Sequence, residues 1–201
     1  MSEAMRLFID MAFMATRGRV LRGCGALDAW TKNEDAWHAK MKILQEPDRV
    51  RDRFAKALAF MTASLQNDMA DFIGPVFMET NADPSFGQFF TPDSLCDLVA
   101  ALTARDWTPG ERQTVQEPAA GVGAMMLALA RQRRAAGGDP AQDLHFSAIE
   151  INGTTARACF VQMDLAGLSA DVFWGDSLKM KMFDDGWSTR AVIDARLRQA
   201  A

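Results

Sequence analysis

Apolar residues recur with a helical period through the first 75 or so residues of the chain. The clearest run begins after Pro47, a residue favoured in the first turn of a helix, and we expect Gly74-Pro75 to end it. Its apolar stripe consists of Val50, Phe54, Leu58, Met61, Leu65, Met69 and Phe72. Side chains of this size are typical of a core or an interface. The pattern therefore predicts an all-helical N-terminal region, residues 1–78.

From Thr114 onward the pattern changes to short apolar strands separated by helices. In order, it predicts a strand at Thr114–Glu117, a helix at Ala124–Arg134, a strand at Leu144–Ile151, a helix at Thr154–Ala166 and a strand at Asp171–Trp174. This βαβαβ order is typical of half of a doubly wound parallel sheet. The fold class is therefore α/β, with an incomplete Rossmann-like domain at residues 79–186 and a C-terminal helix, starting near Ser188, within residues 187–201.

A separate helix is expected between these two regions. It follows a loop that combines turn-forming residues with three phenylalanines. Thr91 is predicted as its N-cap and Pro92 as its first helical residue. The residues that then fall on one apolar face are Leu95, Leu98, Val99 and Leu102. The free N–H groups at its start give this part of the chain a helix end that can face an anion.

Each predicted strand ends in an acidic residue. Glu117, Glu150 and Asp176 follow the three strands in turn, and ligands of parallel sheets bind at the carboxyl ends of strands. We therefore expect the three carboxylates to face one crevice. Gly121 and Gly123 fall in the turn before the next helix, where they permit positive φ and a close approach of the backbone to a ligand. Together these features indicate a nucleotide-like cofactor.

The composition fits a folded cytoplasmic protein. The 201 residues are 49% hydrophobic, which is enough to bury a core. No run of about 18 apolar residues occurs, and Glu3, Arg6 and Asp10 interrupt the Met-rich start, so we expect neither a membrane span nor a signal peptide. The three cysteines are widely separated and lack C-x-x-C spacing, so we expect no disulfide framework and no metal site.

Charge is unevenly distributed along the chain. Residues 1–66 carry eleven Lys/Arg and eight Asp/Glu, a balance of +3, whereas residues 67–201 carry eleven and eighteen, a balance of −7. The basic residues of the first part include Arg17, Arg19, Arg22, Lys40, Lys42, Arg49, Arg51, Arg53 and Lys56. A basic helical face of this kind can follow the phosphate backbone of double-stranded DNA, and it can equally be an ordinary solvated surface.

Four segments occur in an order that resembles a known enzyme family. They are Gly87-Gln88-Phe89-Phe90-Thr91-Pro92, the run from Glu117 to Gly123, Glu150, and Gly175-Asp176-Ser177. This order resembles the motifs of S-adenosylmethionine-dependent DNA adenine-N6 methyltransferases, and is most similar to the modification subunits of type I restriction systems. The segment Asp71–Phe77 is similar to the helical lead-in of that family's G-x-F/Y-x-T-P motif. The resemblance covers roughly residues 68–178.

The resemblance implies a class I methyltransferase core that binds S-adenosylmethionine. The implied cofactor-binding residues are Phe89, Thr91, Pro92, Glu117, Ala119, Gly121, Gly123, Glu150, Ile151, Asp176 and Ser177. Phe89, Thr91 and Pro92 would line the methionine end of the cofactor. Glu117 would face the methionine amino group, and the two glycines would let the backbone close on methionine and ribose. Glu150 would accept hydrogen bonds from both ribose hydroxyls, and Asp176 would accept one from the adenine amine.

A nicotinamide-dinucleotide site is the alternative for the glycine turn, and it fits less well. Pro118 lies inside the turn, Met126 stands where the third glycine of G-x-G-x-x-G would be, and Glu150 comes 27 residues after Gly123. A glycine turn after a strand does not by itself separate the two families.

The family's catalytic motif has no counterpart in this chain. The motif is an Asn/Asp-Pro-Pro-aromatic loop that holds the target amine and stacks on the flipped base. The 201 residues contain no Pro-Pro pair, and the last proline is Pro140. The catalytic residues are therefore unknown. Asp184-Asp185-Gly186-Trp187 carries an acid and an aromatic residue, but it is more typical of a plain turn.

The first predicted strand normally pairs with a fourth strand, which the sequence does not show. An unpaired inner strand leaves backbone polar groups open, so something should cover it. The candidates are the C-terminal helix at Ser188–Gln199, a second copy of the chain in a homodimer, or a partner chain that brings the missing loop.

These observations leave three functional hypotheses. The first is an adenine-specific DNA methyltransferase that needs a partner for its catalytic loop. The second is a non-catalytic relative that binds DNA or protein and regulates modification. The third is methylation of RNA or protein, because the missing loop is the element that distinguishes these substrates.

Overall fold

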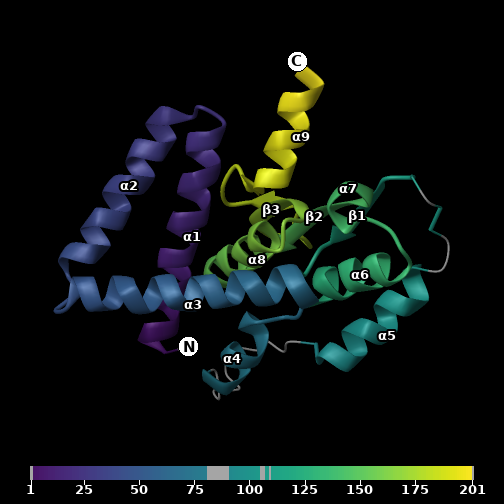
Figure 1. Cartoon of the computed structure of the whole chain (residues 1–201), viewed down its shortest axis with the longest axis horizontal. Coiled ribbons are helices and arrows are strands. Elements are labelled where there is room, and N and C mark those ends of the chain that lie inside the picture. Colours follow the sequence, from purple (N-terminus) through teal and green to yellow (C-terminus); the bar gives the residue numbers. More distant parts are fainter. Residues whose placement is uncertain (1, 81–90, 105–106, 109, 201) are drawn as a thin grey trace.

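The computed structural model describes residues 2–80, 91–104, 107–108 and 110–200. The chain begins with four helices, α1 (Glu3–Gly23), α2 (Leu27–Lys42), α3 (Pro47–Asp68) and α4 (Ile73–Thr80). The remainder comprises α5 (Asp93–Thr103), β1 (Gln113–Glu117), α6 (Ala124–Ala135), α7 (Pro140–Asp143), β2 (Leu144–Glu150), α8 (Gly153–Leu165), β3 (Ser169–Asp176), β4 (Lys181–Met182), β5 (Trp187–Ser188) and α9 (Arg190–Ala200). In Figure 1, helices α1 and α2 lie to one side of α8 and helices α5 and α6 to the other, while α3 runs past α8 from the α2 side toward α6.

The sheet confirms the predicted α/β class. β1 pairs in parallel with β2, and β2 pairs in parallel with β3, with α6 and α8 as connecting helices. β4 and β5 then run antiparallel along the outer edge of β3. The protein is therefore a mixed α/β fold with a mostly parallel sheet that follows an N-terminal helical region.

The two faces of the sheet are covered unequally. On one face, Leu144, Phe146 and Ala148 of β2 are fully buried, and α8 packs against β2 and β3. On the opposite face, Thr114 and Gln116 of β1 are exposed. Parallel sheets are normally covered by helices on both faces. Within the described residues, helix α9 covers the second face only near the start of the strands, where it shares a hollow with the strand residues.

The C-terminal segment differs from the expected helix. Helix α9 begins at Arg190, and the preceding Trp187–Ser188 forms β5, which pairs with Val172 and Asp171 of β3. Trp187 is 8% exposed, and its ring packs 4.6 Å from the ring of Phe13 in α1. Asp184 Oδ1 accepts a hydrogen bond from Gly186 N at 3.0 Å. The segment 184–187 is thus the predicted turn, and its aromatic residue belongs to the core.

The end predicted for the long helix at Gly74-Pro75 is wrong. Helix α3 ends at Asp68, and Met69 adopts a left-handed conformation with φ 51°. Gly74 and Pro75 lie in the first turn of α4. The N–H groups of a first turn have no acceptor within the helix, so a proline there removes no helical hydrogen bond. The break depends on a distant side chain, because Arg131 Nη1 of α6 donates to Met69 O at 2.7 Å.

The helical region and the sheet share one hydrophobic core. A single cluster of buried side chains extends from Ile9 of α1 and Leu65 of α3 to Phe146 of β2 and Phe160 of α8. The expected domain boundaries near residues 78 and 186 stay predictions, and this core crosses both. Among the described residues, no helix has the length and apolar composition that crossing a membrane requires.

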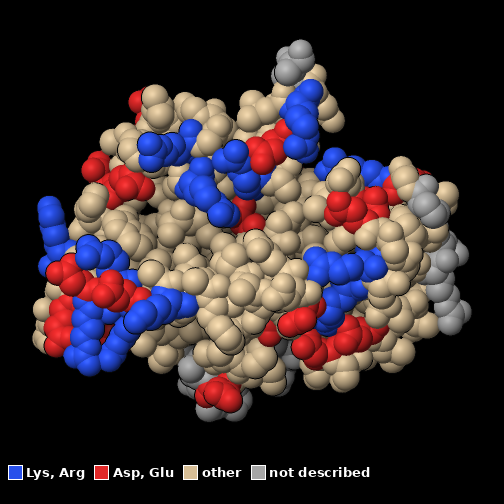
Figure 2. Space-filling view, viewed as in Figure 1, with Lys and Arg blue, Asp and Glu red and all other residues tan. Residues whose placement is uncertain are grey.

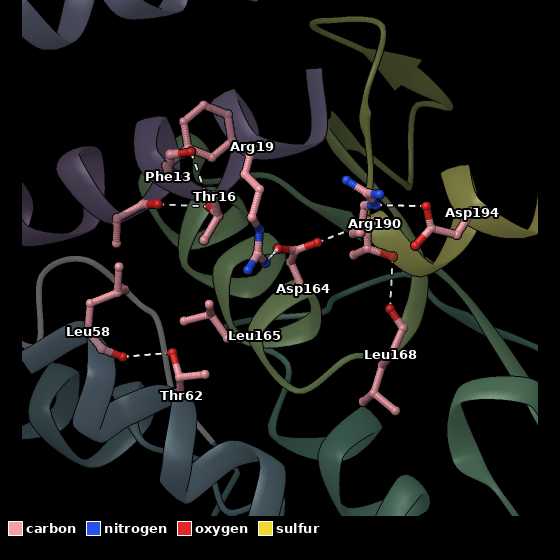
Figure 3. A network of polar contacts seen from close by, with 12 residues as sticks. Phe13, Thr16, Arg19, Leu58, Thr62, Asp164, Leu165, Leu168, Arg190 and Asp194 are labelled. Atoms are coloured by element: carbon pink, nitrogen blue, oxygen red, sulfur yellow. Dashed lines mark hydrogen bonds and ion pairs between the residues drawn. The ribbon is translucent and has the colours of Figure 1, made fainter. Parts of the chain in front are cut away.

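A buried carboxylate on α8 joins both ends of the chain. Asp164 Oδ2 accepts a hydrogen bond from Arg19 Nη2 of α1 at 2.6 Å, and its Oδ1 accepts one from Arg190 N at 2.7 Å (Figure 3). The side chain of Asp164 has no exposed area. Arg190 in turn pairs with Asp194. Asp164 therefore anchors α1 and provides an acceptor for an otherwise free N–H group at the start of α9.

A second buried polar side chain of α8 joins the helical region to the turn after β1. Gln162 Oε1 accepts hydrogen bonds from Phe72 N and Ile73 N at 2.9 and 3.2 Å. Its Nε2 donates to Val122 O at 2.9 Å and to Asp71 Oδ1 at 2.8 Å. Gln162 is fully buried. Burial also raises the pKa of Asp71, despite the hydrogen bonds that it accepts from Gly74 and Gln162.

We expect the substitution Gln162→Leu to lower the free energy of unfolding by about 2–4 kcal/mol, because it leaves several buried donors and acceptors without partners. Urea denaturation followed by circular dichroism measures the change. The control is Gln45→Leu, since Gln45 is exposed and should change stability by less than about 0.5 kcal/mol. Equal midpoints for the two variants would contradict the structural role of Gln162.

Candidate functional site

The strand register places the three predicted acids on one face and at one end of the sheet. Glu117 pairs with Ala148, two residues before Glu150, and Glu150 pairs with Trp174, two residues before Asp176. Because side chains alternate between faces along a strand, the three carboxylates lie on the same face of the sheet. The structure thus brings together the polar ends of three adjacent parallel strands.

The glycine turn after β1 contacts Glu150 directly. Gly121 N donates to Glu150 Oε2 at 2.9 Å, and Ala120 N donates to Ile149 O at 2.9 Å. Glu150 is 6% exposed. The turn is shaped by positive φ angles of 55° at Gly121 and 102° at Gly123, which L-residues other than glycine rarely adopt. The result is a backbone turn that is fixed against a buried carboxylate.

The two glycines face different surroundings. A Cβ atom on Gly123 would lie 2.9 Å from Met163 Cε and 3.5 Å from Cys159 Sγ, both in α8. Gly123 therefore allows α6 to begin close to α8. The expectation that both glycines let the backbone close on methionine and ribose stays a prediction. Burial raises the pKa of the neighbouring Cys159 thiol, and the negative charge of Glu150 raises it further.

Residues next to Glu150 fix the end of β2. Asn152 N donates to Glu150 Oε1 at 2.8 Å, and Asn152 Oδ1 caps α8 by accepting from Thr154 N and Thr155 N. Ile151 is 60% exposed, and its carbonyl accepts a hydrogen bond from Trp174 Nε1 at 3.0 Å. The exposed apolar side chain of Ile151 therefore stands next to a carboxylate that is held at both oxygens.

Asp176 is the last residue of β3 and caps the turn that follows it. Its Oδ1 accepts from Lys179 N at 3.0 Å, and its Oδ2 lies 3.2 Å from Lys179 Nζ. These bonds to the backbone and side chain of Lys179 lower the pKa of Asp176. Asp176 is therefore charged at neutral pH. Lys179 is 79% exposed in its side chain, so its ammonium group can leave without opening a core.

The remaining predicted residues are placed in part. Ala119 N donates to Glu117 Oε1 at 3.2 Å, so the carboxylate of Glu117 turns toward its own loop. Ser177 begins the turn after β3. Phe89 and most of its motif lie outside the described residues. Thr91 and Pro92 are exposed ahead of α5.

The predicted start of α5 is wrong by one residue. Pro92 is the N-cap, with an extended ψ of 143°, and no side chain caps the helix, so Thr91 is not the N-cap. Two aspartates of the first turns, Asp93 and Asp97, instead approach Arg131 Nη2 of α6 at 3.6 and 2.6 Å. The helix is thus positioned by an ion-pair group that the local sequence does not reveal.

The apolar face predicted for α5 is exposed. The exposed fractions are 47% for Leu95, 56% for Leu98, 37% for Val99 and 54% for Leu102. The buried face of α5 consists of Cys96 and Ala100, which pack against Ala124 and Ala128 of α6. Helix α5 therefore carries an apolar stripe that the described chain does not cover.

A hollow of about 410 Å³ lies on the open face of the sheet near the strand ends. It is lined by Gln116, Glu117, Pro118, Ser147, Ile149, Phe173, Met180 and Met182. Among the predicted site residues it includes Glu117 only. The described residues contain no group of three or more His, Cys, Asp or Glu side chains placed to hold a metal ion.

Comparison with known proteins gives the family of the chain. The family model described as N-6 DNA methylase matches residues 68–195. Because this match covers more than half of the 201 residues, the chain belongs to the N-6 DNA methylase family. This family comprises adenine-specific DNA methyltransferases.

A solved structure and the curated proteins were also compared. A crystal structure from Listeria monocytogenes, titled as a candidate class I S-adenosylmethionine-dependent methyltransferase, matches with 14% sequence identity and a TM-score of 0.46. The match covers 84% of this chain and 52% of that chain, so this chain spans about half the length of that protein. No curated protein matches the chain.

Sequence reasoning missed the residues that hold the site in place. Gln162 positions the glycine turn through Val122 O, and Trp174 holds the carbonyl of Ile151. Neither has a local signal, because each acts across elements that are distant in sequence. Asn152 does have a local signal in the sequence, because Asn followed by Gly-Thr-Thr is typical of a helix N-cap.

We expect Gly123→Ala to destabilise the fold by about 1–3 kcal/mol, because the methyl group meets α8 and the backbone has positive φ. Gly25→Ala is the matched control, since Gly25 has φ 76° with no atom within 4 Å of the added Cβ. The difference between their thermal midpoints isolates the contact with α8. Equal losses in the two variants would show that only the backbone conformation matters.

Proposed function

We propose that the chain is the cofactor-binding part of an adenine-N6 DNA methyltransferase and binds S-adenosylmethionine. One observation carries the proposal: the glycine turn after β1 is hydrogen-bonded to Glu150, with Glu117 and Asp176 on the same face at adjacent strand ends. Family membership supports it independently. A carboxylate beside a glycine turn at the carboxyl edge of a parallel sheet suits a ligand with a ribose diol.

The residues present fit the chemistry of this cofactor. Glu150 uses both oxygens to accept backbone N–H groups, and each carboxylate oxygen has further lone pairs for ribose hydroxyls. Charged Asp176 offers an acceptor for the adenine amine once Lys179 moves, and Ile151 offers an apolar contact for the ring. Bound S-adenosylmethionine would supply the activated methyl group. The chain itself binds and orients it.

We propose that a partner chain supplies the part of the enzyme that holds the target base. Within the described residues, no strand pairs with β1 on the side away from β2, because β4 and β5 pair with the opposite edge of the sheet. From the sequence, three candidates could cover the free edge of β1, one of which is the C-terminal helix. Helix α9 packs instead against β3. A parallel strand from a partner would satisfy the free backbone groups of β1.

The exposed stripe of α5 supports the same partner. Arg133 of α6 donates to Gln113 of β1, so α6 lies over β1, and α5 packs on the side of α6 away from α8 (Figure 1). The apolar stripe and the free strand edge are therefore on the same side of the molecule. A partner that adds a strand beside β1 and packs apolar side chains on Leu98 and its neighbours would cover both. Such a partner would carry the Asn/Asp-Pro-Pro-aromatic loop, with a second copy of this chain as the alternative cover.

A non-catalytic role is the second candidate. The absence of a Pro-Pro pair in the 201 residues favours it, because the loop that holds the target amine is then missing. In this role the chain would bind DNA or protein and regulate modification. Contact with double-stranded DNA through the basic helices belongs to either role. Several of those cations are already paired, as in Arg19–Asp164, Lys40–Asp10 and Arg49–Glu46.

Cofactor binding tests the proposal. We expect titration calorimetry to show S-adenosylmethionine binding by the wild type, with a loss of about tenfold or more for Glu150→Gln and for Asp176→Asn, because each weakens a charge-assisted hydrogen bond. The control is Asp35→Asn, an exposed acid of α2. Thermal unfolding of each variant checks the fold. Absent binding by the folded wild type, or equal binding by all four proteins, would overturn the proposal.

The partner surface is tested by Leu98→Glu. Because Leu98 is 56% exposed, we expect no loss of stability or cofactor affinity in the isolated chain. Methyl transfer from labelled cofactor to unmethylated duplex DNA, assayed with a purified partner that carries an Asn-Pro-Pro-aromatic loop, should fall by tenfold or more. Leu27→Glu is the control, at 60% exposure on α2. Transfer by the purified chain alone would reject both the partner requirement and the non-catalytic role.

A further inference from the structure

A hollow between the first two helices gathers cations that exceed the anions around it. It has a volume of about 480 Å³ and is lined mainly by α1 and α2, with Arg157 contributed by α8. Its charged lining residues are Asp10, Arg17, Lys32, Lys40 and Arg157. The lining therefore carries four cations and one carboxylate. A volume of this size is typical of sites for small organic ligands.

The one carboxylate of the lining is already shared by two of the cations. Lys40 Nζ lies 2.5 Å from Asp10 Oδ2, and Arg157 Nη1 lies 2.8 Å from Asp10 Oδ1. The side chain of Asp10 is 13% exposed, so these two cations are held in fixed positions at the wall of the hollow. Because the single negative charge of Asp10 is shared by Lys40 and Arg157, this group of three side chains has a net charge of +1.

Arg17 adds a cation that has no ion pair or hydrogen bond among the described residues. It is half-buried, and its guanidinium lies 5.6 Å from the centre of the Phe13 ring, as does that of Arg157. Burial lowers the pKa of Arg17 and nearby Arg157 lowers it further, against an opposing effect of Asp184. A half-buried cation with no anion at ion-pair distance is incompletely compensated, so its retention points to a ligand that supplies a closer negative charge.

The remaining lining gives the hollow a directed geometry. Asn33 is buried, and its Nδ2 donates to Met14 O at 2.8 Å, which holds α2 against α1 on one side of the hollow. Lys32 is exposed at its rim. The hollow is therefore lined by the apolar ring of Phe13, by cations held in ion pairs and by the exposed cation of Lys32.

We propose that this hollow binds a phosphate-bearing ligand, with Arg17 and Arg157 as the principal contacts. A phosphate group is the anion that best matches two guanidinium groups and two ammonium groups around one opening. Its source is either the backbone of duplex DNA or a free nucleotide. The site shares no residue with the proposed cofactor site, so it does not rest on the proposed function.

Figure 2 shows why this hollow is a better candidate than the basic surface in general. On the face drawn, Lys and Arg side chains at the junction of α2 and α3 alternate with Asp and Glu. Arg49 pairs with Glu46 and Arg51 pairs with Asp48 in that part of the chain. Positive charge there is neutralised by local ion pairs, whereas Arg17 makes none among the described residues.

Binding of pyrophosphate, of adenosine triphosphate and of a fluorescent 20-base-pair duplex tests the proposal on the full chain. We expect at least one probe to bind, with affinity reduced about tenfold in Arg17→Gln and restored in part in Arg17→Lys. Arg51→Gln is the control, since Arg51 is an exposed, locally paired cation of α3. Competition separates the sources: duplex binding that falls in Arg17→Gln and is displaced by pyrophosphate assigns the phosphate to DNA. Binding of the small probes with unchanged duplex affinity assigns it to a free nucleotide.

Thermal stability distinguishes a ligand-binding role of Arg17 from a purely structural one. Because Arg17 makes no ion pair or hydrogen bond among the described residues, we expect Arg17→Met to keep or raise the thermal midpoint in the absence of phosphate, and to lose the rise that pyrophosphate gives the wild type. A lower midpoint in Arg17→Met without ligand would overturn the proposal. The same applies if no probe binds the folded wild type, or if Arg17→Gln and Arg51→Gln bind equally. Affinity for S-adenosylmethionine should be the same in all these variants.

Discussion

The arrangement of the molecule depends on the buried side chain of Gln162. This one amide accepts the backbone N–H groups of Phe72 and Ile73 and donates to Val122 O and Asp71. If these hydrogen bonds were lost, each buried donor or acceptor left without a partner would destabilise the fold by its desolvation free energy. The start of α4 and the glycine turn are therefore fixed by the same contact. The helical region and the candidate cofactor site cannot be treated as independent units.

Helix α8 connects the rest of the fold because it is buried on nearly all sides. Its buried residues run from Thr155 to Leu165 with few interruptions, and three of them, Thr155, Gln162 and Asp164, are polar. Residues two apart on a helix point about 200° away from each other. Gln162 therefore reaches the glycine turn, while Asp164 reaches Arg19 and Arg190. The cost of burying Gln162 and Asp164 is offset by the hydrogen bonds that each side chain makes.

Much of the fold could be predicted from the sequence, because its signals are local. The alternation of strands and helices gave the parallel order of β1, β2 and β3, and the position of each acid after a strand gave the shared edge. The break after Asp68 and the strand at Trp187 could not be predicted, since Arg131 and β3 stabilise them from far along the chain. The packing of Gly123 against α8 could not be predicted for the same reason: its neighbour Met163 lies 40 residues later.

The exposed apolar face of α5 is the most informative of these features. Leu95, Leu98, Val99 and Leu102 have the spacing of a buried face, yet all are exposed, while the smaller Cys96 and Ala100 face α6. A stripe with core spacing implies an apolar neighbour, and the free edge of β1 implies a strand. Both features lie on the side of the sheet where we propose that a partner chain binds. At the proposed cofactor site, by contrast, the glycine turn and Glu150 are already held by hydrogen bonds within the chain. The fold is therefore well braced at the proposed cofactor site and open at the proposed partner surface.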